Sequence, residues 1–466
     1  MTSDPQPPTT LWSGRFDTAP DAAALEFGAS FPFDRRLFAD DVTGSLAWAR
    51  ALAAAGVLKP EEAAQIAAAL TGILEHGLAH PESVAGADED VHSFVERLLV
   101  ERVGDAGRRL HTGRSRNEQV SLDLRLYLRR RIPALQRSVA GLVEALCVQA
   151  AGAGEALMPA YTHFRPAQPV LVAHFFLAHV APLRRDFDRL GAARAEADAL
   201  PLGSGAIAGT SYAIDVDALA RDLGFTGVVA NSIDASSDRD FASAFLFACT
   251  LTMVHLSRLA EDLIIFCGDE HGFFELSDAL STGSSMMPQK KNPDPLELVR
   301  GKAGRSLGHL VALLTTLKGL PSGYNKDLQE DKEGVFDTED TLAGSLAVVR
   351  SVVAGLTINR ERAASAASGL LLATDVADYL VGRGVPFRRA HEIVGALVRK
   401  LLREGRDFES LSLEEWRTAS DRFDADVASR ITPRVSAAAK RTPQSTAPGA
   451  VAERLAEAQR WLAGLR

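Results

Sequence analysis

Long stretches of apolar periodicity run through the middle of the chain, between about residues 119 and 360, with few glycines or prolines to interrupt them. Ala, Leu, Glu and Arg dominate these stretches, so the pattern predicts long α-helices. Long helices with few breakers are typical of a helical bundle. The predicted helices cover residues 133–157, 167–199, 238–266, 294–319 and 336–356.

Residues 120–128 depart from the helical pattern, because Leu or Val at every second position alternates with polar residues. Such alternation is typical of a half-buried strand. The flanking sequence is helical and the polar positions are rich in arginine, so we predict a helix here as well.

The stretch at residues 241–257 carries no charged side chain. A membrane-spanning helix needs roughly 20 apolar residues. This stretch is shorter, contains two threonines and His255, and is bracketed by Asp240 and Arg258. We therefore expect a helix that is buried on every side within the protein, and no membrane span.

The predicted helix that begins at Asp294 carries a second carboxylate, Glu297, in its first turn, where negative charge favours the helix dipole. Gly301, Gly304 and Gly308 follow. Each glycine costs about 1 kcal/mol of helix stability relative to alanine. Their presence predicts close approach by another helix, and a bent surface helix is the alternative.

A length of 466 residues favours two or three domains. We predict an N-terminal mixed helical domain at 1–112, a central long-helix bundle at 113–360 and a small helical C-terminal domain at 361–466. Residues 1–10 are rich in Pro and Thr and lack both a basic start and an apolar run. We interpret them as a tail and not as a signal peptide.

Charge and cysteine content narrow the classes of partner and compartment. The formal net charge is −9 and the pI about 5.7, which disfavours nucleic acid and anionic membranes as partners. Cys147, Cys249 and Cys267 are far apart and form no CxxC pair. The sequence therefore predicts a cytoplasmic protein without disulfides.

The histidines give no sign of a metal site. His174 and His179 are five residues apart, which does not place them on one helical face, and the chain has no HExxH motif or Cys/His set. We expect no metal.

Five polar runs interrupt the apolar pattern, and they are candidates for chemistry. The run at 324–333 is most simply a solvated helix face held by Lys/Glu pairs, although Tyr324 and Gln329 suit recognition. The five runs are residues 89–92, 111–117, 161–165, 283–293 and 324–333.

The run at 111–117 places two arginines, a serine, a threonine and an asparagine around one glycine. A solvated loop would explain the charges but not the small hydroxyls between them, so we predict binding of a carboxylate or phosphate. His163 follows Thr162 in a loop shortly before Pro166. A lone histidine is usually structural, and general acid–base catalysis is the alternative.

The run at 283–293 reads Gly-Ser-Ser-Met-Met-Pro-Gln-Lys-Lys-Asn-Pro. Its glycine and prolines exclude a regular helix or strand. We predict a structured loop that presents hydroxyl, ammonium and backbone N–H groups together. The run resembles the signature loop of the fumarase/aspartase superfamily.

The five runs, in this order and spacing, resemble the argininosuccinate lyase family over nearly the whole chain. The stretches at 110–117 and 318–333 point to this family and not to fumarase, aspartase or adenylosuccinate lyase. Residues 11–16, 201–206 and 385–391 extend the resemblance.

The resemblance implies an all-α, three-domain fumarase/aspartase-like fold whose central helices form the core of a homotetramer, with each active site built by three subunits. It implies reversible elimination of argininosuccinate to arginine and fumarate, the last step of arginine biosynthesis, without a metal or organic cofactor. Such a reaction needs a base for the proton beside a carboxylate, positive charge for the resulting dianion, and a proton for the leaving guanidinium.

The family's pattern also implies roles for individual residues. Ser284 and His163 would exchange protons with the substrate in an order that the sequence leaves open, helped by Lys290, which lowers the pKa of the serine hydroxyl, and by Glu297, which orients His163. Ser115, Arg116, Asn117, Thr162 and Asn292 would hold the succinyl carboxylates, and Ser30, Tyr324, Gln329 and Lys332 the arginine portion.

The chain departs from the family at two places. Phe164-Arg165 stands where the family more often has Leu-Gln, which leaves the protonation behaviour of His163 open, and Met286-Met287 has Met where Leu is usual. Two other functions remain as alternatives. One is a lyase for another succinyl adduct such as adenylosuccinate, and the other is a crystallin-like structural protein.

Overall fold

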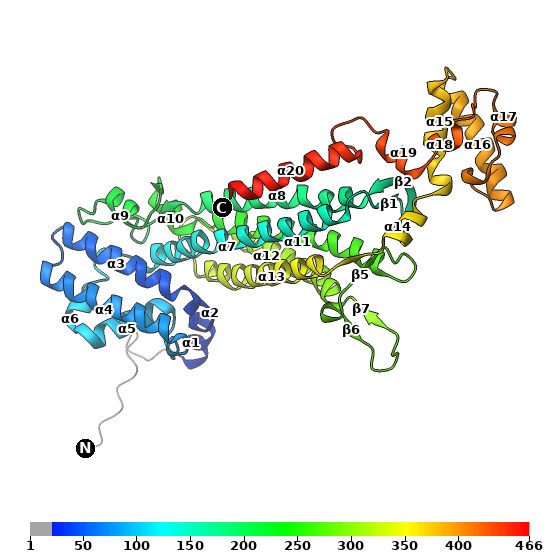
Figure 1. Ribbon diagram of the computed structural model, residues 1–466. Helices are drawn as coiled ribbons and strands as arrows, with labels where there is room; N and C mark the ends of the chain where they lie inside the picture. Colours follow the sequence, from blue (N-terminus) through cyan, green and yellow to red (C-terminus); the bar gives the residue numbers. More distant parts are fainter. Residues whose placement is uncertain (1–20, 466) are drawn as a thin grey trace. The chain divides into compact units, whose positions relative to one another are not determined.

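The computed structural model describes residues 21–465, and α-helices dominate it (Figure 1). The all-α prediction is confirmed. The described residues also contain four small sheets of two strands each. The expected tail at 1–10 and the motif at 11–16 lie outside the described residues.

The chain forms two compact units, and each is discontinuous in sequence. Unit 1 contains the chain up to Leu135 together with Arg189–Thr250 and Arg305–Thr341. Unit 2 contains Gln136–Asp188, Leu251–Gly304 and the chain from Leu342 onward. The three-domain division at residues 113 and 361 stays a prediction.

Five long helices carry the chain through both units, as the apolar periodicity predicts. The predicted helix at 167–199 is wrong at its start, because residues up to Leu171 form a strand. Prolines at 166 and 169 lack the N–H that a helix interior needs. The long helices are α7 (Arg116–Ala153), α8 (Val172–Glu196), α11 (Asp240–Cys267), α12 (Asp294–Leu317) and α13 (Asp331–Ala354).

The alternating stretch at 120–128 lies within α7 and is helical, as predicted. Its polar side chains are buried along with the apolar ones, so the alternation does not mark two faces. Arg125, for example, donates from Nε to Ser121 Oγ at 3.4 Å and from Nη1 to the carbonyl oxygen of Glu196 at 3.2 Å. The period-2 pattern therefore reflects internal polar contacts and not a strand.

Short helices and one small parallel sheet complete unit 1. Trp48 and Leu52 of α3, Leu70 of α4 and Leu99 of α5 have no exposed surface and form part of its core. Its elements are α1 (Ala22–Gly28), α2 (Phe31–Asp34), η2 (Arg35–Leu37), α3 (Phe38–Ala54), α4 (Pro60–Ala79), η3 (Pro81–Ser83), α5 (Val91–Val103), α6 (Asp105–Arg108), β3 (Ala199–Leu200), α9 (Val216–Asp222), β4 (Gly227–Val228), α10 (Ser232–Ser237) and η5 (Lys326–Glu330).

Unit 2 contains three antiparallel strand pairs, β1–β2, β5–β8 and β6–β7, and the C-terminal helices. Its elements are β1 (Leu157–Thr162), β2 (Arg165–Leu171), β5 (Phe274–Glu275), η4 (Asp278–Leu280), β6 (Thr282–Gly283), β7 (Lys291–Asn292), β8 (Thr357–Ile358), α14 (Arg360–Ala366), η6 (Gly369–Leu372), α15 (Ala373–Gly382), α16 (Phe387–Glu404), η7 (Phe408–Ser410), α17 (Leu413–Ala419), α18 (Val427–Arg430), α19 (Pro433–Ala438) and α20 (Pro448–Gly464).

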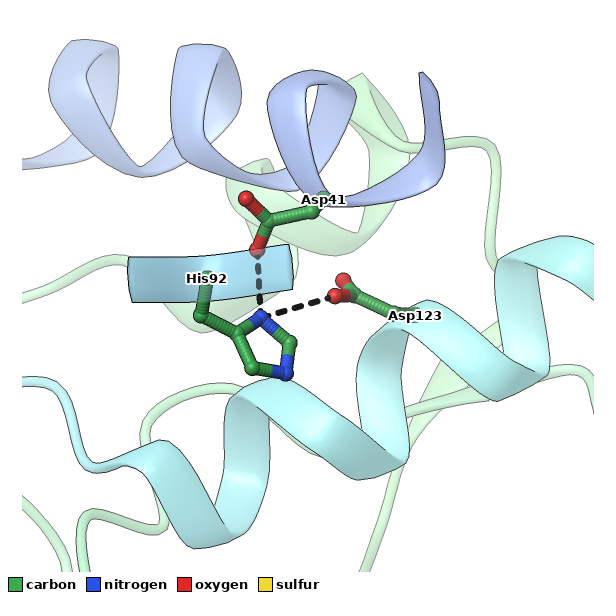
Figure 2. A group of neighbouring side chains, drawn as sticks. All are labelled: Asp41, His92 and Asp123. Atoms are coloured by element: carbon green, nitrogen blue, oxygen red, sulfur yellow. Dashed lines mark hydrogen bonds and ion pairs between the residues drawn. The ribbon is translucent and has the colours of Figure 1, made fainter. Parts of the chain in front are cut away.

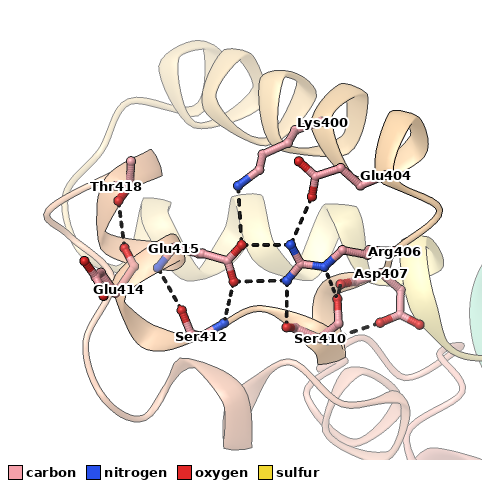
Figure 3. Close-up of polar contacts among 9 residues, drawn as sticks. All are labelled: Lys400, Glu404, Arg406, Asp407, Ser410, Ser412, Glu414, Glu415 and Thr418. Carbon is pink, nitrogen blue, oxygen red and sulfur yellow. Dashed lines mark hydrogen bonds and ion pairs between the residues drawn. The ribbon is translucent and has the colours of Figure 1, made fainter.

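A network of polar side chains joins the end of α16 to α17 (Figure 3). The same part of unit 2 contains an apolar cluster that includes Trp416 and Phe423. Gly405 ends the helix in the left-handed conformation, with φ +64°. Arg406 then donates to both carboxylate oxygens of Glu415, at 2.8 and 3.0 Å. This bidentate pair fixes α17 against the end of α16.

Two expectations about the long helices are wrong within the described chain. α11 is not buried on every side, because Phe247 and Val254 are about half exposed. The glycines at 301, 304 and 308 do not meet another helix of the described chain, since no described atom beyond the neighbouring residues and the backbone of α12 itself lies within 4 Å of a Cβ built at any of them.

α11 is long and apolar enough to cross a bilayer by length and composition alone, and 56% of its most apolar window is buried in the protein.

Candidate active site

The start of α7 carries three predicted substrate residues on a capped helix N-terminus. The backbone N–H of Asn117 donates to Ser115 Oγ at 3.2 Å, and the backbone N–H of Ser115 donates to Glu118 Oε1 at 3.0 Å. First-turn N–H groups and the helix dipole favour an anion at such a terminus. The arrangement fits the predicted binding of a carboxylate.

Arg116 is held at the same terminus by acidic neighbours. Its guanidinium lies 3.4 Å from Glu96 and 3.9 Å from Asp90, and it donates to Gln119 Oε1 at 3.1 Å. Arg116 and its three partners are all partly or fully buried, so the direction of the guanidinium is set before any ligand binds.

Ser30 lies beside the polar run at 89–92. Its backbone N–H donates to the carbonyl oxygen of Glu89 at 2.8 Å, and its hydroxyl donates to Asp34 Oδ2 at 2.5 Å. The other oxygen of Asp34 accepts from the backbone N–H of Val91 at 3.0 Å. Gln329, a predicted substrate residue 301 positions from Gly28, donates to that glycine's carbonyl oxygen at 3.1 Å.

The polar run at 324–333 is not a solvated helix face. Asp331 and Lys332, at the start of α13, are both buried, and Lys332 Nζ donates to Asp331 Oδ1 at 2.8 Å. The same carboxylate accepts from Arg239 Nε at 2.5 Å. Burial raises the pKa of Asp331, but the charges of Lys332 and Arg239 outweigh it and the net shift is downward. Burial also raises the pKa of Tyr324.

Within unit 1 the structure therefore brings together segments that lie far apart in sequence. Lys326, in the run that holds Tyr324, Gln329 and Lys332, lies 3.5 Å from Glu89. Glu89 and Asp90 thus contact three segments, which are those of Ser30, of Arg116 and of residues 324–333.

Unit 1 also contains a buried triad that the sequence does not predict. Figure 2 shows His92, from the start of α5, between Asp41 of α3 and Asp123 of α7. His92 Nδ1 lies 2.8 Å from Asp41 Oδ1 and 3.3 Å from Asp123 Oδ2. The side chains of all three residues have at most 1% exposure. The polar run at 89–92 is the only feature of the sequence that points to the triad.

One imidazole nitrogen and two carboxylate oxygens within 4.8 Å are chemically able to hold a divalent metal. The surroundings instead supply protein charges and donors to this carboxylate pair. Gln119 Nε2 donates to Asp41 Oδ1 at 2.5 Å, and the guanidinium of Arg114 is buried nearby. We interpret the group as an internal ion cluster that supports the residue 111–117 segment.

The two carboxyls of the cluster differ in their pKa. Burial raises the pKa of Asp41, but the charge and hydrogen bond of His92 outweigh it and lower the pKa to about 2. Burial and the negative charge of Asp41 raise the pKa of Asp123 well above its ordinary value. The negative charge of Asp41 therefore disfavours a second negative charge on Asp123.

In unit 2, Thr162 and His163 lie at the tip of the β1–β2 hairpin. Thr162 pairs with Arg165, and His163 and Phe164 form the two-residue turn with φ of 54° and 55°. Both central residues of a type I′ turn need positive φ, which is unfavourable for side chains other than Gly and Asn. The turn places the side chains of His163 and Phe164 in exposed positions.

The loop between β6 and β7 positions Ser284. Its Oγ accepts from the backbone N–H of Met287 at 3.0 Å and of Met286 at 3.3 Å. Two N–H donors stabilise negative charge on the oxygen, so they favour an ionised serine. The role of Ser284 as the base stays a prediction.

The two adjacent lysines of this loop have different surroundings. Lys291 lies 2.8 Å from Asp278 and donates to the carbonyl oxygen of Leu276 at 2.5 Å. Lys290 is exposed, and its ammonium has no ion pair among residues 21–465. Of the two, Lys290 is free to act on a ligand. Asn292 donates to Thr282 Oγ1 at 3.4 Å across the strand pair.

Glu297 lies in the first turn of α12, 3.9 Å from Arg300, and its side chain is 51% exposed. No hydrogen bond or ion pair joins it to His163 within the described chain. The predicted orientation of His163 by Glu297 is therefore not made inside one subunit, and the site roles of these residues stay predictions.

Comparison with known proteins identifies the family. The family model described as "Lyase" matches residues 14–308, and the one described as "Argininosuccinate lyase C-terminal" matches residues 370–438. The argininosuccinate lyase of Moorella thermoacetica is 49% identical over 457 residues, covering 98% of each chain. That of Roseiflexus sp. is 50% identical over 450 residues, covering 97% of this chain and 99% of the relative.

Solved structures agree on the fold. EDDS lyase in complex with formate has a TM-score of 0.84 at 27% identity, covering 95% of this chain and 90% of that one. A fumarate lyase from Mesorhizobium sp. BNC1 has a TM-score of 0.76 at 20% identity, covering 93% and 97%. The chain belongs to the argininosuccinate lyase family, within the fumarase/aspartase superfamily of lyases.

Proposed function

We propose that this protein catalyses the reversible elimination of argininosuccinate to L-arginine and fumarate, and so acts in arginine biosynthesis. The observation that carries the proposal is the Ser284 loop, in which two backbone N–H groups converge on the hydroxyl oxygen of a full-length member of this family. The relatives match nearly the whole chain, and the family model described as "Argininosuccinate lyase C-terminal" matches residues 370–438.

Residues of each unit have a proposed role in the reaction. In unit 2, Ser284 and His163 would take a proton from carbon and return one to the guanidinium nitrogen, and Lys290 would add positive charge beside them. In unit 1, Ser115 and Asn117 at the α7 N-terminus would bind a carboxylate of the succinyl part.

A homotetramer with shared active sites would supply the contacts that one subunit lacks. On α12, Leu307, Val311 and Leu314 lie on one helical face and are 49–54% exposed, and the three glycines open the same helix to close approach. An apolar stripe of this kind on a long helix marks an interface between subunits. We propose that α12 packs against partner subunits and that Glu297 orients the His163 of another subunit.

We also propose a cytoplasmic location. Cys147, Cys249 and Cys267 are free thiols, as expected in a reducing compartment.

The proposal is tested by incubating the purified protein with argininosuccinate and following fumarate by its ultraviolet absorbance and arginine by amino-acid analysis. Equal release of both products supports it. Turnover of adenylosuccinate in place of argininosuccinate would assign another succinyl adduct, and no turnover of either by a folded tetramer would favour a structural protein.

A further inference from the structure

Glu118 is a fully buried carboxylate that joins two segments of unit 1. Its Oε1 accepts from the backbone N–H of Ser115 at 3.0 Å, at the start of α7. Its Oε2 accepts from the backbone N–H of Gly205 at 3.0 Å, 87 residues further along the chain. Both oxygens are therefore used, each on a different segment.

The second segment, residues 202–209, is a glycine-rich turn with a demanding backbone. Gly205 has φ +59°, and a Cβ at this position would lie 2.5 Å from the carbonyl oxygen of Gly209. The backbone N–H of Gly209 donates to the carbonyl oxygen of Ser204 at 2.7 Å, which closes the turn. Only glycine at position 205 allows this turn and presents its N–H to Glu118.

The 202–209 segment contacts two stretches that carry predicted substrate residues. Asn117 Nδ2 donates to the carbonyl oxygen of Ala206 at 3.4 Å. On the other side, Ile207 Cγ2 lies 3.5 Å from the position of a Cβ at Gly323, the residue before Tyr324. The segment therefore lies between the α7 N-terminus and the Tyr324 stretch.

We propose that Glu118 is a positioning residue, which holds the 202–209 segment against the α7 N-terminus and thereby sets the placement of Ser115, Asn117 and Tyr324 around the substrate. This inference rests on the proposed function for its kinetic part and on the geometry alone for its structural part. Glu118 itself makes no contact with the reacting atoms, because it is fully buried beneath the two segments.

The surroundings of Glu118 also shift its pKa. Burial raises its pKa to about 7, although the backbone N–H groups of Ser115 and Gly205 and the charge of Arg114 oppose the rise. The 202–209 segment contributes no titratable side chain, so Arg114 and these N–H groups are what stabilises the carboxylate.

The experiment compares the wild-type tetramer with Glu118→Gln, Gly205→Ala and the double variant. Glu101→Gln, an exposed acid on α5 whose partner is Arg97, is the matched control. In Glu118→Gln one backbone N–H must face the amide nitrogen, which leaves a buried donor unsatisfied. We expect roughly 10- to 100-fold lower kcat/KM for argininosuccinate, mainly through KM.

Gly205→Ala should have a similar effect, and the double variant should be no worse than the more impaired single one, because both break the same contact. Hydrogen exchange of the amides at residues 204–209 should be at least about 10-fold faster in Glu118→Gln than in wild type.

Unchanged exchange in Glu118→Gln would overturn the structural part of the inference, and faster exchange with unchanged KM would overturn the positioning role. Should the wild type fail to release fumarate, the proposed function fails, while the exchange measurement still decides whether Glu118 holds the segment.

Discussion

His92 Nδ1 lies 2.8 Å from Asp41 Oδ1, and neither side chain has more than 1% of its surface exposed. The contact is the centre of the ion cluster beneath the α7 N-terminus (Figure 2). Breaking a buried pair by removing one partner leaves an uncompensated charge. The cluster therefore has to be complete for unit 1 to be stable.

We expect His92→Leu to lower the free energy of unfolding by about 3 kcal/mol, because Asp41 loses its main opposite charge. Urea unfolding at a fixed protein concentration measures the change. His80→Leu, at a histidine whose side chain is 57% exposed, is the control and should change stability by less than about 0.5 kcal/mol. Equal effects of the two variants would contradict the assigned role of the cluster.

Asp41 predicts a loss of stability at acid pH. Its pKa is about 2 in the folded protein, below the ordinary value of 3.8, so its contribution is present above pH 3.8 and is lost as the pH falls towards 2. An Asp41→Asn variant should therefore have a smaller decrease in melting temperature than wild type over this range. A steeper decrease in the variant would be the wrong result.

Glu118 predicts the opposite dependence. Its folded-state pKa of about 7 lies above the ordinary 4.5, so the folded state holds the proton more tightly. This contribution, about 3 kcal/mol, is present below pH 4.5 and is lost as the pH rises to 7. We expect wild type to lose stability relative to Glu118→Gln across this window, as measured by thermal unfolding at each pH. A constant difference between the two proteins would exclude the raised pKa.

The apolar stripe of α12 predicts where subunits meet. Val311 is 54% exposed, and a charge buried there in an interface would be unpaired. We expect Val311→Glu to dissociate the proposed tetramer, as measured by light scattering on a sizing column. Leu402→Glu, at a residue of α16 that is 65% exposed, is the matched control and should leave the mass unchanged. A Val311→Glu protein with wild-type mass would exclude α12 from the interface.

The sequence predicts the helical class and the long helices well, because their apolar periodicity is long and few breakers interrupt it. The prediction fails where tertiary contacts override a local sequence pattern. The buried polar side chains of Ser121 and Arg125 produce an alternation that resembles a strand within α7. The exposed Phe247 and the open face at Gly304 cannot be foreseen, because the sequence does not distinguish burial within one chain from burial between chains.

The candidate site likewise has residues that the sequence predicts and contacts that it does not. Polar runs and their resemblance to a family identify Ser284, His163 and the α7 terminus, since these residues are consecutive in short motifs. The distant partners of Asp331 and Glu118, which are Arg239 and Gly205, lie 92 and 87 positions away, and only the folded chain brings them together.

We propose that the 283–293 loop supplies the proton-transfer chemistry for release of fumarate from argininosuccinate. The most direct measurement is the initial rate of fumarate formation by wild type, Ser284→Ala and Ser285→Ala at equal protein concentration. We predict that Ser284→Ala loses roughly 100-fold or more in kcat, because it removes a general acid–base group, while Ser285→Ala retains most of its activity. A folded Ser284→Ala protein that releases fumarate at the wild-type rate would exclude Ser284 from the proton transfer.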